Sequence, residues 1–130
     1  MSHQVIYHLV PKPIWLTCKE TGKSYLPSTY EQDGFIHATK DANTLVDIGN
    51  YFCKQDKADY LVLCIDPDLL EVPLKYESAA PVGNKEAHTS DTEMLFPHIY
   101  GPLNLSSVIK EYDVTRDDDG SFISIKGLAD

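Results

Sequence analysis

Residues 60–66 read YLVLCID, and this almost wholly apolar run decides how the rest of the chain is interpreted. An apolar run of this length, followed by the turn-forming segment PDLL, is typical of a strand that is buried on both faces. The sequence therefore predicts that 60–66 is the central strand of the domain.

The segments around this run show strand and helix patterns early in the chain and mainly strand patterns later. We expect strands over 4–10, 35–39 and 72–77, helices over 14–22 and 41–54, and a C-terminal hairpin over 106–125 whose turn contains Asp119-Gly120. In the second helix, Leu45, Ile48 and Phe52 recur at helical spacing, which predicts the principal core helix. Helices early and strands late indicate an α+β domain with a mainly antiparallel sheet.

The length and composition of the chain are those of one globular domain. Its 130 residues are enough for a single core, and 42% of them are hydrophobic, so we expect one domain with its core over about 5–114. No apolar run approaches the roughly 20 residues of a membrane span, and the N-terminus lacks the basic region and cleavage site of a signal peptide. Cys18, Cys53 and Cys64 have no metal-type spacing and indicate reduced thiols in a cytoplasmic protein.

The charge of the chain argues against nucleic acid as a partner. The net charge is -9, and Arg116 is the only arginine among eleven basic residues. Proteins hold phosphate backbones with clusters of lysine and arginine, so we expect no binding of duplex nucleic acid. A small ligand in a local pocket is compatible with this charge, because net charge says little about one site. Nothing in the sequence specifies an oligomeric state.

A second segment, 95–103, reads LFPHIYGPL and places an imidazole and a phenol inside an apolar run. Pro97, Gly101 and Pro102 stiffen or break the backbone around it. His98 and Tyr100 are two residues apart, so an extended chain points both side chains the same way. We expect this segment to present His98 and Tyr100 at the rim of a pocket.

Two further histidines have the same setting as His98. They are His8 in YHLV and His37 in FIHAT, and each lies in an apolar run that we expect to be extended. Three strands of one small sheet can bring these imidazoles to a single cleft, where each ring can donate at one nitrogen and accept at the other. Glu93, just before the third segment, can supply a carboxylate. The alternatives are core histidines bonded to backbone carbonyls and a three-histidine metal site.

Other site types find little support in the sequence. The chain contains no GxSxG, GxxxxGK[ST], GxGxxG or HExxH motif. Cys53 and Cys64 lie in apolar surroundings, which raise a thiol pKa and make the thiol unreactive. The stretch 78–93 has no periodicity, and a loop of this length is usually functional or mobile, so we expect it to border the cleft.

Several motifs together resemble a known family. They are IYHLVPK, W-x-x-C-K-x-T-G, Y-x-P-S, GFIHATK and FPHIYGPL, which follow one another in order over residues 5–110. This set resembles the DUF952 family, which is distantly similar to the ADP-ribosyltransferase fold, a split β-sheet that grips NAD. In that fold a histidine of the first core strand holds a ribose hydroxyl and the nicotinamide amide, a position that His8 matches.

The resemblance also suggests roles for other residues. GFIHAT loosely matches the second motif of the fold through His37 and Thr39, and a late glutamate that polarises the ribose points to Glu93. Together with the setting of His98, the resemblance makes His8, His37, Glu93 and His98 candidate catalytic residues. The candidate ligand-binding residues are Tyr25, Ser28, Thr39 and Tyr100.

These patterns lead to one functional expectation and two alternatives. We expect an ADP-ribosyltransferase-like protein that binds NAD, as a substrate, or a related nucleotide in a histidine-lined cleft, without a metal ion. The first alternative is a non-catalytic module for a small molecule or nucleotide. The second is a metal site on the three histidines.

Overall fold

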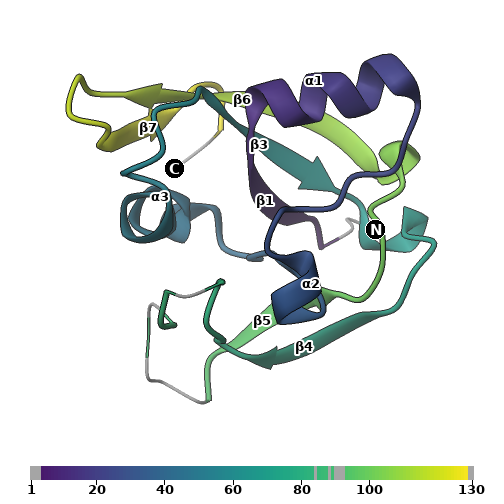
Figure 1. Cartoon of the computed structure of the whole chain (residues 1–130). Coiled ribbons are helices and arrows are strands. Elements are labelled where there is room, and N and C mark those ends of the chain that lie inside the picture. The colour runs from purple at the N-terminus through teal and green to yellow at the C-terminus, as the bar shows by residue number, and fades with distance from the viewer. Residues whose placement is uncertain (1–3, 84, 88, 90–92, 129–130) are drawn as a thin grey trace.

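The computed structural model describes residues 4–128 except 84, 88 and 90–92, and it shows one small α+β domain. Figure 1 shows the elements in chain order. They are β1 (Ile6–Pro11), α1 (Lys12–Thr21), α2 (Tyr30–Asp33), β2 (Ile36–His37), α3 (Leu45–Phe52), β3 (Tyr60–Ile65), β4 (Leu74–Ser78), β5 (Leu95–Ile99), β6 (Val108–Arg116) and β7 (Phe122–Ile125). Short 3-10 turns cover Ala42–Thr44, Pro67–Leu69 and Leu105–Ser107.

The strands form two sheets, and every strand pairing among the described residues is antiparallel. One sheet has the order β1-β3-β6-β7 and the other the order β2-β5-β4. Backbone hydrogen bonds between Tyr7 and Thr39 join the edge of the first sheet to the segment after β2. The expected antiparallel pairing is therefore present, in two sheets that meet beside β1.

The central strand lies where the sequence predicts it. All six residues of β3 are buried, and the strand pairs with β1 on one side and β6 on the other. Leu61, Leu63 and Ile65 point to one face, while Val62 and Cys64 point to the opposite face, because side chains alternate along a strand. The hairpin of β6 and β7 is also confirmed, with Gly120 at a φ of 95° in its turn.

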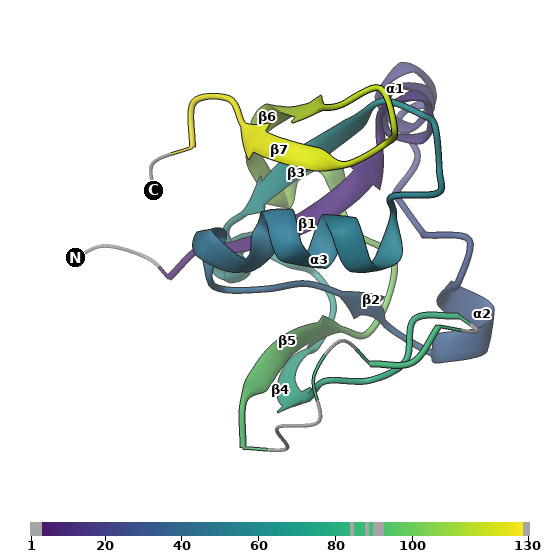
Figure 2. The same cartoon turned by 90° about the vertical axis from the view of Figure 1, so that its left-hand side faces the viewer.

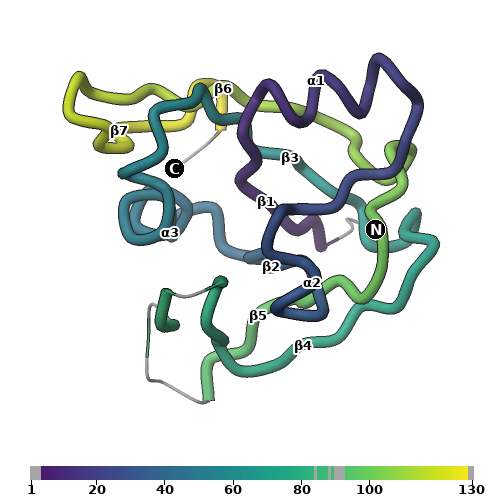
Figure 3. The backbone as a smooth tube through the Cα atoms, viewed as in Figure 1, coloured from purple at the N-terminus to yellow at the C-terminus, as the bar shows by residue number. Residues whose placement is uncertain are grey.

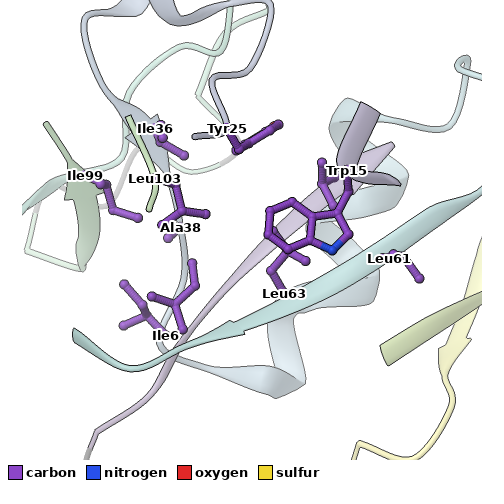
Figure 4. Close-up of a cluster of buried hydrophobic side chains, with 11 residues drawn as sticks. Ile6, Trp15, Tyr25, Ile36, Ala38, Leu61, Leu63, Ile99 and Leu103 are labelled. Carbon is purple, nitrogen blue, oxygen red and sulfur yellow. The ribbon is translucent and has the colours of Figure 1, made fainter. Parts of the chain in front are cut away.

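The main hydrophobic core lies between the two sheets, as Figure 4 shows. Leu63 and Ile6 come from the four-stranded sheet, whereas Ile36 and Ile99 come from the three-stranded sheet, and all four side chains are fully buried. Trp15 of α1 closes the cluster at one end. The three-stranded sheet is thus fixed in place through one face only.

The first helix begins two residues before its predicted start at residue 14 and ends one residue before its predicted end at residue 22. Pro11 is its N-cap and Pro13 lies in its first turn, where a missing N–H costs nothing. Gly22 ends the helix with a φ of 71° and donates its N–H to the Cys18 carbonyl. The short helix α2, in the loop that follows, was not predicted. Its single turn ends at Gly34, with a φ of 83°.

The expectation for the helix at 41–54 needs a correction. A 3-10 turn capped by Asp41 precedes α3. Of the three residues of α3 that were predicted to lie in the core, only Leu45 is buried. Ile48 and Phe52 are half-buried and line a pocket instead. The helix packs on β7, where Gly49 lies so close to Phe122 that a Cβ atom would approach its ring to 2.3 Å.

Helix α3 lies between the two sheets on one side of the molecule. Figure 2 shows α3 running between the four-stranded sheet and the pair β4 and β5. The tube in Figure 3 shows β2 passing from α2 towards α3 between the same two layers. Leu45, Ile48 and Phe52 of α3 line a pocket together with residues of both sheets.

Candidate functional site

The residues that line this pocket come from both sheets, from α3 and from the loop after β4. Its volume is about 660 Å³ when the part open to solvent is counted. The lining residues are Tyr7, His8, Leu9, His37, Ala38, Thr39, Leu45, Ile48, Phe52, Cys53, Ala79, Ala80, Val82, Phe96 and His98. Among these described residues there is no lysine, arginine, aspartate or glutamate, so the pocket wall is apolar with a few imidazoles.

The register of the three-stranded sheet places the chemistry on one face. His37 of β2 pairs with His98 of β5, so both imidazoles project to the same side, and their ring centroids are 5.6 Å apart. Glu77 of β4 pairs with Phe96, two residues before His98, and therefore lies on that side as well. The opposite face carries the core residues Ile36 and Ile99.

His98 has a carboxylate partner at one ring nitrogen. Its Nδ1 lies 2.9 Å from Glu77 Oε1, and the Tyr100 hydroxyl donates to the same oxygen at 2.5 Å. The prediction that His98 and Tyr100 point the same way is thus confirmed. Hydrogen bonds from Tyr100 and His98 lower the pKa of Glu77, which keeps this carboxylate ionised.

Phe35 fixes the plane of the His98 ring. The two rings stack with centroids 4.1 Å apart and an interplanar angle of 21°. Phe35 also contacts His37 and Tyr100, at centroid distances of 4.7 Å and 5.3 Å. The aromatic ring therefore packs the histidine pair together at one end of the pocket.

His37 has a carboxylate partner of its own. Its Nε2 lies 2.9 Å from Asp33 Oδ2, and its side chain keeps 19% exposure. Burial lowers the pKa of His37, and the hydrogen bond to Asp33 opposes this effect. Both Asp33 oxygens also accept the Gly83 N–H at 3.1 Å. Asp33 therefore connects His37 to the loop that lines the pocket.

His8 differs from the other two histidines because both of its ring nitrogens are engaged. Nδ1 lies 2.5 Å from the His37 carbonyl oxygen, and Nε2 lies 3.0 Å from the Tyr25 hydroxyl. Burial lowers its pKa to about 4, so the ring is neutral at physiological pH. His8 borders the pocket, but its hydrogen bonds tie β1 to the β2 segment and to the core.

The carboxylate beside His98 is not the one that the sequence suggested. Glu93 is exposed, precedes β5 and is not among the pocket-lining residues. Glu77 instead provides the carboxylate next to His98. The sequence contained one signal for it: in VPLKYE, Lys75 and Glu77 alternate with apolar residues and must share a face. Its pairing with β5 could not be read from the sequence, because it depends on strand order.

Comparison with known proteins identifies the family. A family model described as "Protein of unknown function (DUF952)" matches residues 9–111. The chain belongs to the DUF952 family. No curated protein matches it in sequence.

Solved structures share the fold of this DUF952 protein. The crystal structure of protein CC0527 from Caulobacter crescentus has a TM-score of 0.70 at 23% identity, covering 92% of this chain and 93% of that chain. Its solution NMR structure has a TM-score of 0.64 at 24% identity, covering 96% of this chain and 93% of that one. At this level of identity the likeness concerns the fold alone.

The remaining ligand-binding candidates of the DUF952 protein lie in different surroundings. Thr39 lines the pocket and is buried, with its hydroxyl near Thr44. Tyr100 lies beside the pocket, where its hydroxyl donates to Glu77. Tyr25 is only 1% exposed and lies in the core, and Ser28 is exposed in a turn, so neither lines the pocket.

The alternative of a metal site on the three histidines can be compared with the described residues. Among the described residues, no group of three or more histidine, cysteine or acidic side chains is arranged to hold a metal ion. His8 has no nitrogen left for a metal, because its two hydrogen bonds use both. Cys53 lines the pocket, but burial raises the pKa of its thiol. His3 and His88 lie outside the described residues.

The loop after β4 forms one wall of the pocket, as its sequence suggested. Ala79, Ala80 and Val82 are among the lining residues. Gly83 is held by Asp33 of α2, and Lys85 lies over the Tyr51 ring of α3 at 4.7 Å. We call residues 79–83 with 85–87 the strap, because they connect α2 and α3 beside the pocket. In the described part of the chain, no helix is long and apolar enough to cross a membrane.

Proposed function

We propose that this DUF952 protein has an ADP-ribosyltransferase-like fold and binds NAD or a related nucleotide in the histidine-lined pocket, from which it transfers ADP-ribose. One observation carries the proposal. Three strands that are distant in the sequence bring His8, His37 and His98 to a single pocket where an antiparallel sheet splits. A split sheet of this kind is what the sequence resemblance implies.

The lining of the pocket supports a particular orientation of the nucleotide. Because no charged side chain lines the described wall, a phosphate placed inside would lose its hydration without gaining an ionic partner. An aromatic ring suits the apolar wall, and its polar edge can bond to His37. The nicotinamide or nucleobase would therefore enter the pocket, and the phosphates would stay at the open mouth.

A non-catalytic binding module is the second candidate, and one observation favours it. Among the described residues no carboxylate lines the pocket, and Glu93, the acid that the resemblance suggests, is not one of its lining residues. A transferase needs groups that stabilise the positive charge developing on the ribose as nicotinamide leaves. In this candidate the nucleotide binds and is released unchanged.

Two measurements on the full chain separate these functions. A nucleotide at 100 times its Kd should stabilise the protein by about 2.7 kcal/mol, which thermal unfolding with NAD, ADP-ribose and nicotinamide detects. Nicotinamide release from NAD, followed by chromatography, then reports transfer or hydrolysis. Binding with release supports the transferase, whereas binding without release supports the module. If none of the three ligands shifts the melting temperature, both candidates are wrong.

Two variants test whether the pocket is the site. Glu93→Gln asks whether the acid suggested by the resemblance contributes, and we expect no loss of binding because Glu93 lies outside the pocket. His37→Ala should weaken binding. Glu20→Gln, on the exposed end of α1, is the control for a change of charge. We also propose a cytoplasmic location, which the three free cysteines support.

A further inference from the structure

The pocket contains few groups that can accept a proton from a substrate. Both nitrogens of His8 are engaged, and burial raises the pKa of the Cys53 thiol. His37 and His98 each keep one ring nitrogen without a hydrogen-bond partner among the described residues. The base for any acceptor in this pocket is therefore one of these two imidazoles.

The surroundings of His98 are better arranged for a fixed base than those of His37. The carboxylate of Glu77 is held by a second donor, the Tyr100 hydroxyl, and the imidazole plane is held by Phe35. Asp33, by contrast, divides its oxygens between His37 and the Gly83 N–H of the strap. A base that is locked in one rotamer loses less entropy in the transition state.

The hydrogen bond to Glu77 also determines which nitrogen of His98 is basic. A carboxylate at Nδ1 accepts the ring proton there, so Nε2 is left as the acceptor. Only 3% of the His98 side chain is exposed to solvent. His98 nevertheless lines the pocket, so a substrate bound there lies against this ring.

We propose that His98 is the general base of the transfer and that Glu77 is its positioning residue, an inference that rests on the proposed function. In this step the glycosidic bond between ribose C1′ and the nicotinamide nitrogen breaks, and its electron pair neutralises the positive nicotinamide ring. The oxygen of a hydroxyl acceptor or water forms the new bond to C1′. Its proton goes to His98 Nε2 and then to solvent. Glu77 stabilises the imidazolium that forms.

The test compares Glu77→Gln, His98→Gln and the control Glu20→Gln in the NAD assay. Loss of a general base lowers kcat by about 10²–10⁴-fold, so we expect His98→Gln to fall in that range. Glu77→Gln should lower kcat by about tenfold or more. The KM for NAD should change less than about threefold, because Glu77 does not line the pocket. Glu77→Asp should recover part of the lost kcat.

A spectroscopic measurement tests the same inference without turnover. Long-range ¹H–¹⁵N spectra of the wild-type protein should show His98 protonated at Nδ1, and Glu77→Ala should lose this preference. Tyr100→Phe, which keeps the Glu77 carboxylate, should retain it. A wild-type spectrum with the proton on Nε2 overturns the inference even if a variant fails to fold.

The outcomes separate this inference from the function on which it rests. If NAD is turned over but Glu77→Gln and Glu20→Gln have the same kcat, the positioning role is wrong and the proposed function stands. If NAD binds without any turnover, the base is wrong and the nucleotide site stands. If NAD does not bind, the proposed function and the inference fall together.

Discussion

The four-stranded sheet and the three-stranded sheet differ in what covers their second face. In the first, β3 is buried on both faces, with Leu63 in the main core and Val62 on the opposite side, both at 0% exposure. In the second, Ile36 and Ile99 enter the core, but the other face carries His37, His98 and Glu77 beside a pocket. One sheet therefore holds the fold together, while the other uses only half of its surface for that purpose.

The same contrast separates the three histidines. His8 belongs to the four-stranded sheet and has protein partners at both nitrogens. His37 and His98 belong to the three-stranded sheet, and each has one carboxylate partner and one nitrogen without a partner among the described residues. A shared strand-like sequence setting thus yields one structural imidazole and two that are available for chemistry.

The largest expected difference is in amide exchange. Amides of β3, such as those of Leu61 and Leu63, should exchange only through global unfolding, which for domains of this kind costs about 5–15 kcal/mol. Ala79 and Ala80 of the strap lie outside the sheets and should exchange through local opening at far lower cost. Hydrogen exchange followed by NMR measures both. Equal protection in the two segments would contradict a strap that opens independently of the four-stranded sheet.

A core truncation in the four-stranded sheet should have the next largest effect. Leu63→Ala removes a fully buried side chain, so we expect a loss of about 2–5 kcal/mol in the free energy of unfolding. Ile109→Ala on β6, where the side chain is 52% exposed, is the matched control and should cost much less. Urea denaturation measures both. Similar losses in the free energy of unfolding would show that the stability of the domain does not depend on the burial of Leu63.

Acid should remove stability through His8. Its folded pKa is about 4 and its unfolded pKa is about 6.5, so below pH 6.5 the unfolded chain binds a proton that the native chain does not. Stability from this group is complete above about pH 6.5 and falls by about 3 kcal/mol as the pH decreases to 4. The stability difference between wild type and His8→Gln should therefore shrink over this interval. A constant difference would mean that the ring titrates normally.

His37→Ala should have the smallest effect on stability. The side chain keeps 19% exposure beside a pocket, where water can fill the space and bond to Asp33, so we expect a loss of about 1 kcal/mol. Affinity for the nucleotide should instead fall about tenfold or more. Melting temperature and Kd are measured on the same sample. A loss of 2–4 kcal/mol with unchanged affinity of the folded fraction would place His37 with His8 as a structural histidine.

Many of the helices and strands could be predicted from local patterns. The apolar run at 60–66 is the buried strand β3, Pro13 and Gly22 mark the ends of α1, and the segment around Gly120 turns the C-terminal hairpin. The one-turn helix α2 was missed because four residues give no periodicity to detect. The prediction that α3 is the principal core helix was wrong in part, because the sequence of an apolar helical face is the same whether the face lines a core or a pocket.

The sequence by itself determined that His98 and Tyr100 share a side, since alternation along a strand is a local property. It also determined the apolar settings of the three histidines. Only the tertiary structure decided that Glu77, and not Glu93, lies beside His98, because that contact depends on β4 pairing with β5. Likewise, only the packing of β1 against the β2 segment engaged both nitrogens of His8, because its partners Tyr25 and the His37 carbonyl are distant in the sequence. The side to which a side chain points depends on its neighbours along the strand, whereas its hydrogen-bond partners depend on strand order and register.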